Sequence, residues 1–332
     1  MLTVAVAGIG WWGRTIVGFL KNSAKLRTIM LVDPARDAAA PFAAEAGLPL
    51  VASLNEALAS REVQGVILCT PHTLHCAQIV AAARAGKHVF CEKPLAMSRE
   101  EVVRAISAVE EHCVALGVGH ERRFDTPVLK LEELVAEGRL GILLHVEANL
   151  SQDKFLALPA DNWRLSSREA PAGPLTATGI HMLDMAVHFL GPVERAHATV
   201  RQLGSGLANG DTLAMLLSFR SGASASISGI LTTPFAGRFA LYGSHGWAEL
   251  LDKEHPETPE GWVMNVRLRG EKMRTHEFSP APTVLANLEA FADAALGRAP
   301  YPITHQDMRA TICALEAIIR SCSSGAIEAV EN

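Results

Sequence analysis

The chain is poor in aromatic side chains and lacks the basic excess that is typical of nucleic-acid-binding proteins. Of its 332 residues only 5% are Phe, Trp or Tyr, and 35 acidic residues against 30 Lys and Arg give a formal net charge of −5. Single-stranded nucleic acids bind on aromatic platforms in basic grooves, and a basic face is the usual footprint of a nucleic-acid binder. We therefore expect no nucleic acid among its partners.

Long apolar runs and paired cysteines are also missing. No apolar stretch could span a bilayer without charges or glycines, and the start has no basic region or cleavage pattern of a signal peptide. Without a C-x-x-C pair, a zinc ribbon or disulfide framework is disfavoured, so we expect no metal, no membrane partner and a cytoplasmic protein with reduced thiols. The six scattered cysteines are Cys69, Cys76, Cys91, Cys113, Cys313 and Cys322.

Length and hydrophobic pattern together predict two domains. A chain of this length is longer than the chains that usually fold around a single hydrophobic core. Residues 1–121 alternate apolar strand-like runs with helical patterns, which predicts an α/β domain with a doubly wound parallel sheet of Rossmann type. From Ile142 onward the runs alternate apolar and polar residues, as in strands with one solvated face. Residues 122–332 should therefore form an α+β domain with an open-faced, largely antiparallel sheet.

The clearest motif follows the first predicted strand, Leu2–Ala7. The next six residues fit the pattern G-x-G-x-x-G, and residues 14–21 predict a helix directly behind them. In this context the first glycine permits a tight turn, the second lets the backbone approach a pyrophosphate, and the third lets the helix pack on the strand. The free N–H groups of the helix start favour an anion. We predict a dinucleotide site formed by Gly8, Ile9, Gly10, Trp11, Trp12 and Gly13.

An acidic residue ends the second predicted strand, Leu26–Val32. Asp33 lies about 20 residues beyond the glycines, where a carboxylate accepts from the ribose 2′-hydroxyl. It would repel a 2′-phosphate, so NAD(H) is favoured, although nearby Arg36 leaves NADP(H) possible. A methyltransferase using S-adenosylmethionine would share this much of the pattern.

Polar residues follow the next two predicted strands, Val66–Cys69 and His88–Cys91. The carboxyl ends of parallel strands meet at the edge of the sheet where ligands bind. A metal site at His72 and His75 is the weaker interpretation, because no further ligand completes the set. The residues that we expect to line the cofactor crevice are Thr70, Pro71, His75, Glu92 and Lys93.

Together these motifs resemble the glucose-fructose oxidoreductase/inositol dehydrogenase/MocA-type (Gfo/Idh/MocA) family of NAD(P)-dependent oxidoreductases. The resemblance decides against a methyltransferase and implies a Rossmann domain followed by an open-faced sheet, which commonly forms an oligomer interface. A small-molecule substrate and a homodimer or homotetramer through the C-terminal sheet are therefore expected. The residues that carry the resemblance are the glycine loop, Thr70-Pro71 with His75, the run from Ala85 to Pro94 (AGKHVFCEKP), Arg123-Phe124 and the run from Gly179 to Asp184 (GIHMLD).

The resemblance implies reversible hydride transfer between nicotinamide and a hydroxyl or carbonyl carbon of a sugar, polyol or related cyclic alcohol. Lys93 and His181 would be the catalytic acid/base residues, because the hydroxyl proton needs an acceptor within hydrogen-bond reach. Many relatives carry an aspartate four residues before the histidine, where this chain has Ala177. This departure puts a polyol or inositol substrate in doubt.

Candidate substrate residues lie in and around the irregular segment 153–174, which we interpret as a lid or wall over the substrate. Arginines bind carboxylates bidentately, so an alternative function is a dihydrodiol dehydrogenase for a carboxylated, aromatic-derived substrate. Ala177 motivates a second alternative, a catalytically impaired NAD(H)-binding sensor. The substrate-binding candidates are Arg123, Trp163, Arg164, Thr178 and Asp184.

Overall fold

The computed structural model describes residues 1–255 and 258–331, and the chain divides into two compact units. Unit 1 comprises Met1–Glu121 and Thr283–Met308, and unit 2 comprises Arg122–Pro282 together with the residues from Arg309 onward. The sequence predicts domains of residues 1–121 and 122–332. The boundary after Glu121 is the same, but residues 283–308 belong with unit 1.

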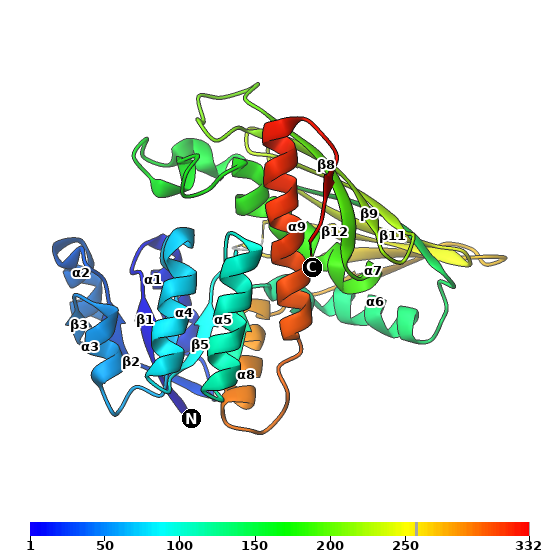
Figure 1. Cartoon of the computed structure of the whole chain (residues 1–332). Coiled ribbons are helices and arrows are strands. Elements are labelled where there is room, and N and C mark those ends of the chain that lie inside the picture. The colour runs from blue at the N-terminus through cyan, green and yellow to red at the C-terminus, as the bar shows by residue number, and fades with distance from the viewer. Residues whose placement is uncertain (256–257, 332) are drawn as a thin grey trace. The chain divides into compact units, whose positions relative to one another are not determined.

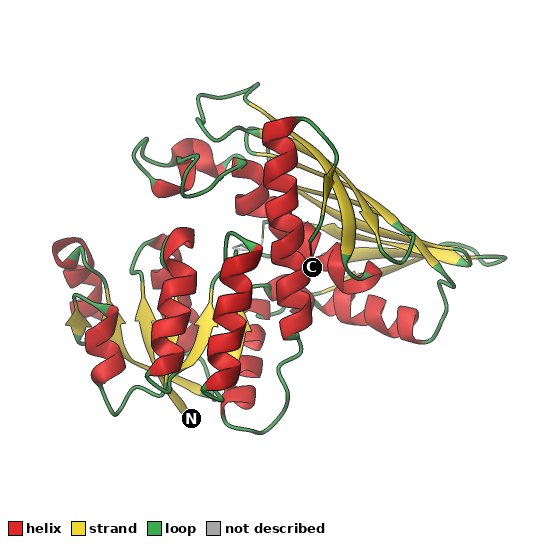
Figure 2. Cartoon of the chain, in the orientation of Figure 1, coloured by secondary structure: helices red, strands yellow, loops and turns green. Residues whose placement is uncertain are grey.

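Unit 1 is built on a six-stranded parallel sheet in the order β3-β2-β1-β4-β5-β6, which confirms the predicted doubly wound fold (Figures 1 and 2). The chain order reverses between β1 and β4, and at such a switch point the loops that leave the strands diverge to form a ligand crevice. Its elements are β1 (Leu2–Ala7), α1 (Trp11–Leu20), β2 (Leu26–Val32), α2 (Arg36–Ala46), β3 (Leu50–Val51), α3 (Leu54–Ala59), β4 (Gly65–Leu68), α4 (His75–Arg84), β5 (His88–Cys91), α5 (Arg99–Glu111) and β6 (Leu116–Val118).

Helix α8 (Thr283–Ala295) packs on this sheet although it lies far along the chain. Its buried face carries Leu288, Phe291 and Ala292, which join the core of unit 1. The Phe291 ring meets the Phe90 ring edge-on at a centroid distance of 5.7 Å, and the Asn287 amide donates to the Val118 carbonyl at 2.9 Å. An apolar helix face shows that a helix is buried but not which core receives it, so the sequence left this helix with the C-terminal domain.

Unit 2 carries a nine-stranded, mostly antiparallel sheet in the order β14-β13-β12-β11-β7-β10-β9-β8-β15 (Figure 1). This confirms the predicted fold class. The succession of strand-like runs along the chain also predicts a plain antiparallel meander, which is wrong, because β7 lies between β11 and β10 and runs parallel to β10. The elements are α6 (Thr126–Ala136), β7 (Leu143–Ser151), α7 (Ile180–Leu190), β8 (Val193–Arg201), β9 (Thr212–Phe219), β10 (Ser224–Ile230), β11 (Ala236–Gly243), β12 (Gly246–Asp252), β13 (Trp262–Leu268), β14 (Arg274–Phe278), α9 (His305–Ser324) and β15 (Glu328–Ala329).

The strands of this sheet alternate in burial as expected for one solvated face. In β9, Leu213, Met215 and Leu217 are buried, whereas Ala214 and Leu216 between them are exposed. Because successive side chains of a strand point to opposite faces, the register places one apolar face on the core and leaves the other face open.

Candidate functional site

The glycine loop joins β1 to α1 in unit 1. Gly8 has a φ of 88°, and a Cβ atom there would lie 2.7 Å from the Cys69 carbonyl oxygen; a Cβ on Gly13 would overlap the Gly8 carbonyl oxygen. A Cβ on Gly10 would meet none of the described atoms within 4 Å. The loop is therefore closed at its first and third glycines and open at the second, as a dinucleotide pyrophosphate requires.

The start of α1 opens onto a hollow of about 530 Å³ lined by Gly10, Trp11, Arg14 and Thr15. Its first turn contains no acidic residue, so no charge within this turn opposes an anion at the free N–H groups. The Arg14 guanidinium donates to the carbonyl oxygens of Ile9 and Ala38, which fixes the loop to the neighbouring chain segment.

Asp33 follows β2 and braces the glycine loop. Its Oδ2 accepts from the Ile9 amide at 2.7 Å, and its Oδ1 accepts from the Ala35 amide at 2.8 Å. A carboxylate has about four acceptor positions, so both oxygens can still accept from a ribose hydroxyl. Asp33 therefore holds the loop and presents negative charge at the same edge of the sheet.

His75 is fully buried and ties the ends of β4 and β5 together. Its Nδ1 lies 2.7 Å from the Pro94 carbonyl oxygen, and its Nε2 lies 3.0 Å from the Thr70 carbonyl oxygen. Burial lowers the pKa of His75. The two carbonyl groups favour the charged ring and raise the pKa, but the effect of burial is larger. The histidine that we predicted to line the crevice thus has both ring nitrogens directed at the main chain of Thr70 and Pro94, a role that its spacing in the sequence could not reveal.

Glu92 and Lys93 follow β5. Glu92 is only 8% exposed, and its Oε2 accepts from the Lys93 amide at 3.3 Å. Burial, and after it the nearby Glu121 carboxylate, raises the pKa of Glu92 to about 7. The carboxyl end of β5 therefore combines a half-buried lysine with a carboxyl group that titrates near neutral pH. Sequence reasoning missed Glu121, because nothing local connects it with Glu92.

In unit 2, His181 lies at the start of α7, behind a π-helical turn over Leu175–Gly179. The sequence predicts one regular helix from Leu175 to Leu190. The Thr176 hydroxyl donates to the Gly173 carbonyl at 3.4 Å and the Thr178 hydroxyl to the Pro174 carbonyl at 3.2 Å, and such back-bonding perturbs a helix. π turns recur at functional sites, and this one contains Ala177.

Asp184 is bound by Arg123. The guanidinium donates to both carboxylate oxygens, at 2.7 and 2.8 Å, and contacts His188 Nδ1 at 2.9 Å. Because arginine can only donate, Nδ1 must accept, so Nε2 carries the proton and donates to Glu132 at 2.6 Å. Arg123 and Asp184, both predicted to bind substrate, therefore satisfy each other and anchor the helix of His181.

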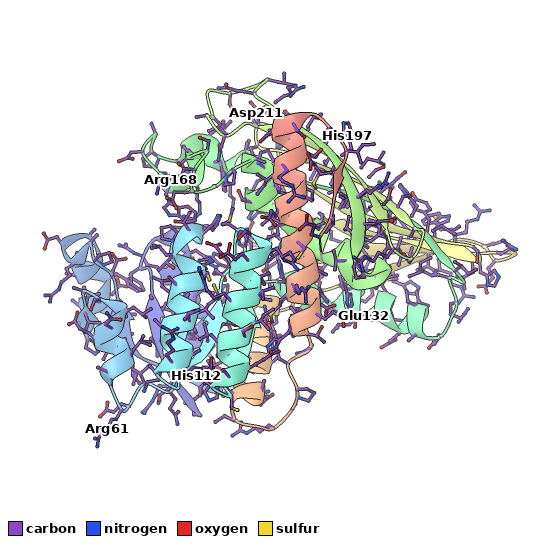
Figure 3. All side chains as sticks on the ribbon, viewed as in Figure 1. Arg61, His112, Glu132, Arg168, His197 and Asp211 are labelled. Atoms are coloured by element: carbon purple, nitrogen blue, oxygen red, sulfur yellow. The ribbon has the colours of Figure 1, made fainter. Side chains whose placement is uncertain are left out.

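Trp163 and Arg164 lie on the irregular segment, in a short 3-10 turn that Asn162 caps. The Arg164 guanidinium stacks over the Trp163 ring at 4.3 Å, so the two half-buried candidates form one surface. Arg168 differs, because its side chain is 89% exposed and points away from the ribbon (Figure 3).

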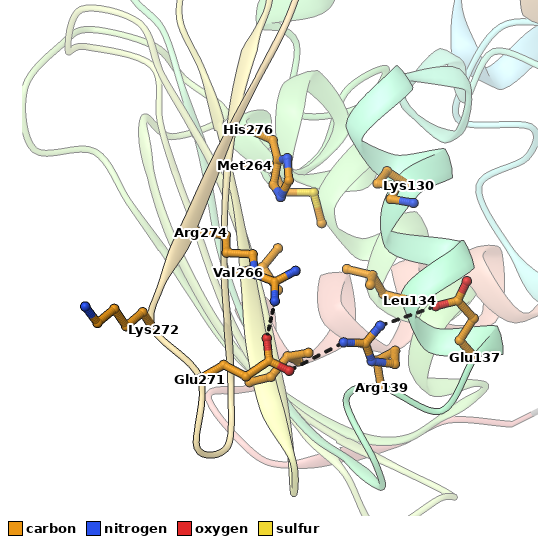
Figure 4. Close-up of a pocket in the computed structure, with 11 residues that line it drawn as sticks. Lys130, Leu134, Glu137, Arg139, Met264, Val266, Glu271, Lys272, Arg274 and His276 are labelled. Atoms are coloured by element: carbon orange, nitrogen blue, oxygen red, sulfur yellow. Dashed lines mark hydrogen bonds and ion pairs between the residues drawn. The ribbon is translucent and has the colours of Figure 1, made fainter.

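Another hollow in unit 2, of about 170 Å³, lies between α6 and the β13–β14 hairpin (Figure 4). Its apolar floor includes Leu134, Met264 and Val266. On its rim Glu271 pairs with Arg274 at 2.6 Å and with Arg139 at 3.6 Å. None of the predicted cofactor or substrate residues lines this hollow.

Over the described ranges, no helix is long and apolar enough to cross a membrane. Within the same residues, no group of three or more His, Cys, Asp or Glu side chains is arranged to hold a metal ion.

The strand order, the open glycine loop and the acid after β2 define unit 1 as a dinucleotide-binding unit of the Rossmann class. Comparison with known families agrees: residues 2–120 match the oxidoreductase family with an NAD-binding Rossmann fold, and residues 128–249 match the GFO/IDH/MocA C-terminal domain. The chain belongs to the Gfo/Idh/MocA family of oxidoreductases, which confirms the predicted family and its NAD-binding Rossmann fold.

Three similar proteins place the chain within this family. The 2,7-anhydro-N-acetylneuraminate hydratase of Escherichia coli (strain K12) is 31% identical over 68% of this chain and 61% of its own length. The 1,5-anhydro-D-fructose reductase of Ensifer adhaerens is 28% identical over 92% of this chain and 91% of its own. The crystal structure of aldose-aldose oxidoreductase from Caulobacter crescentus, complexed with glycerol, has a TM-score of 0.86 at 25% identity and 99% coverage of both chains. The match thus spans less than two thirds of the Escherichia coli relative.

Proposed function

We propose that this protein is an NAD(H)-dependent dehydrogenase or reductase that acts on a hydroxyl or carbonyl carbon of a sugar, polyol or related cyclic alcohol. The observation that carries the proposal is the shared edge of the parallel sheet. The open glycine loop, Asp33, Thr70 and Lys93 all follow strands whose carboxyl ends lie at that edge. A bound nicotinamide would supply or accept the hydride.

The residues of this chain would bind the cofactor and move the proton. The N–H groups at the start of α1 would hold the pyrophosphate, and Asp33 would accept from the ribose. Lys93 would take the hydroxyl proton during oxidation and, as a cation, polarise the carbonyl during reduction. His181 would be the second acid/base residue, with Asp184 and Arg123 fixing its helix.

The names of two relatives point to the substrate class. One is a reductase of 1,5-anhydro-D-fructose and the other a hydratase of a 2,7-anhydro sugar, so cyclic anhydro sugars are the first candidates. A carboxylated aromatic substrate is less favoured than the sequence suggests. The Arg122 guanidinium pairs with Asp252 at 3.0 Å and that of Arg123 with Asp184 at 2.7 Å. We propose the stacked side chains of Trp163 and Arg164 as the substrate surface.

A substrate screen tests the function. Purified protein with NADH should reduce 1,5-anhydro-D-fructose, or with NAD⁺ should oxidise an aldose, an anhydro sugar or myo-inositol. The absorbance of the reduced nicotinamide reports turnover, and a dihydrodiol panel covers the alternative. Tight NADH binding without any turnover would contradict the enzyme and favour the sensor.

Asp33→Ala should weaken NADH binding by about tenfold, because a ribose hydroxyl loses its acceptor, and should reduce discrimination against NADPH. Asp33→Asn is the matched control: it keeps an acceptor for the Ile9 amide but removes the charge, so it should relax discrimination while preserving the loop. Titration by nicotinamide fluorescence measures both affinities. Equal affinity of the unmutated protein for NADH and NADPH would refute the role of Asp33.

We also propose a cytoplasmic homodimer or homotetramer that associates through the open face of the unit 2 sheet. This face carries a polar network in which Arg238 contacts Glu147 and Glu249, at 3.1 and 2.7 Å. The exposed Leu216 lies on the same face, because Ser226 is paired with Glu147 on one side and with Leu216 on the other. All six cysteines are free thiols, as is usual in a reducing compartment. Light scattering measures the oligomer size.

A further inference from the structure

We propose that Asn209 is a positioning residue that holds the segment Trp163–Gly173 and so presents the Trp163–Arg164 surface to the substrate. The inference deepens the proposed function and rests on it for the identity of what this surface meets. Asn209 lies in the connection between β8 and β9, and the sequence Asn209-Gly210 marks it only as part of a turn.

The contacts of Asn209 reach the segment at three places. Its Nδ2 donates to the carbonyl oxygens of Arg164 and Ala170, both at 2.8 Å. The main-chain carbonyl oxygen of Asn209 accepts from the Gly173 amide at 2.7 Å. Asn209 is only 5% exposed. A flipped amide would direct its oxygen at two carbonyl oxygens, so the two N–H bonds determine the orientation.

The β8–β9 connection that carries Asn209 is itself held by a network of hydrogen bonds to Asp211. The Asp211 carboxylate accepts from the backbone amides of Leu203, Gly204 and Ser205 and from the Ser205 hydroxyl. Burial opposes the charge of Asp211, but these hydrogen bonds outweigh it and lower the pKa to about 2. The connection therefore acts as a preformed brace instead of a mobile loop.

The packing between this connection and the segment leaves no room for a side chain at Gly173. A Cβ atom on Gly173 would lie 2.8 Å from the Gly210 carbonyl oxygen and 2.9 Å from Asn209 Cγ. The segment runs directly from this contact into the π turn at Leu175 and on to His181. The side chain of Asn209 thus holds the segment at Arg164 and Ala170, and its main-chain carbonyl holds the approach to α7 at Gly173.

Asn209→Asp tests this role, because the substitution keeps the shape of the side chain and removes both donors. We expect amide hydrogen exchange in residues 163–170 to become about tenfold faster. Kinetics would use the compound that turns over in the screen, of which 1,5-anhydro-D-fructose is the first candidate. KM should rise about tenfold, and this factor should exceed the factor by which kcat falls. The dissociation constant for NADH should not change. Asn22→Asp, the same change at an exposed turn, should alter none of these.

Unchanged exchange in a folded Asn209→Asp protein would overturn the brace, and faster exchange with an unchanged KM would overturn its role in positioning. If the variant does not fold, the unmutated protein still decides: amides of residues 164–173 should exchange more slowly than those of residues 154–161, and equal rates would contradict the proposal. Exchange needs no substrate, so a protein that binds NADH but turns nothing over would refute the proposed function separately.

Discussion

Lys93→Met should lower kcat by about 100-fold or more while leaving the affinity for NADH nearly unchanged. Lys93 lies at the carboxyl end of β5, next to the buried Glu92. If its ammonium group moves the hydroxyl proton, it acts mainly in the transition state, so its loss should affect kcat far more than binding. Methionine keeps most of the length and the apolar character of the lysine stem, which limits structural change.

Steady-state kinetics with the substrate from the screen, together with NADH titration, measures both quantities. Lys21→Met, at an exposed position just after α1, is the matched control and should retain full activity. An unchanged kcat in Lys93→Met would remove this lysine from the chemistry. A large loss of NADH affinity with little effect on kcat would instead make it a cofactor-binding residue.

Glu92→Gln should stabilise the protein at pH 8 and have little effect at pH 5. The pKa of Glu92 is raised from 4.5 to about 7 in the folded state, so the folded protein holds this proton more tightly than the unfolded chain. Between these two values the free energy of unfolding must fall as pH rises, by up to about 3 kcal/mol from this one group. Glutamine is neutral throughout, so this loss disappears.

Urea unfolding at several pH values between 5 and 8 measures the effect, without cofactor, in both proteins. Glu45→Gln, an exposed glutamate on α2, is the control and should keep the pH dependence of the unmutated protein. If Glu92→Gln has the same slope of stability against pH as the unmutated protein, Glu92 titrates like an exposed carboxyl. That outcome would also remove the basis for linking its charge to Lys93.

The residues of unit 1 that follow strands were the most predictable part of this protein. Gly8, Asp33 and Lys93 each occupy a position set by a short local pattern of strand, turn and helix. A parallel sheet brings the carboxyl ends of such strands to one edge whatever the details of packing. Local sequence therefore sufficed to predict the parallel sheet of this unit and its class as an NAD-binding domain.

Other roles became visible only when distant segments were brought together. Glu121 raises the pKa of Glu92 from outside its local motif, and His75 binds the main chain on both sides of its ring. Asn209 contacts a segment about 40 residues away. No spacing rule links such positions, because hydrogen bonds depend on distance in space and not on separation along the chain.

The same reason explains the differences in architecture. Hydrophobic periodicity shows which face of a helix or strand is buried. It predicts a helix over residues 284–296, where α8 lies, and the alternating strands of unit 2. It carries no information about which partner covers that face. The return of α8 to unit 1 and the place of β7 between β11 and β10 follow from the packing of the whole chain, where the free energy depends on contacts between residues that are remote in sequence.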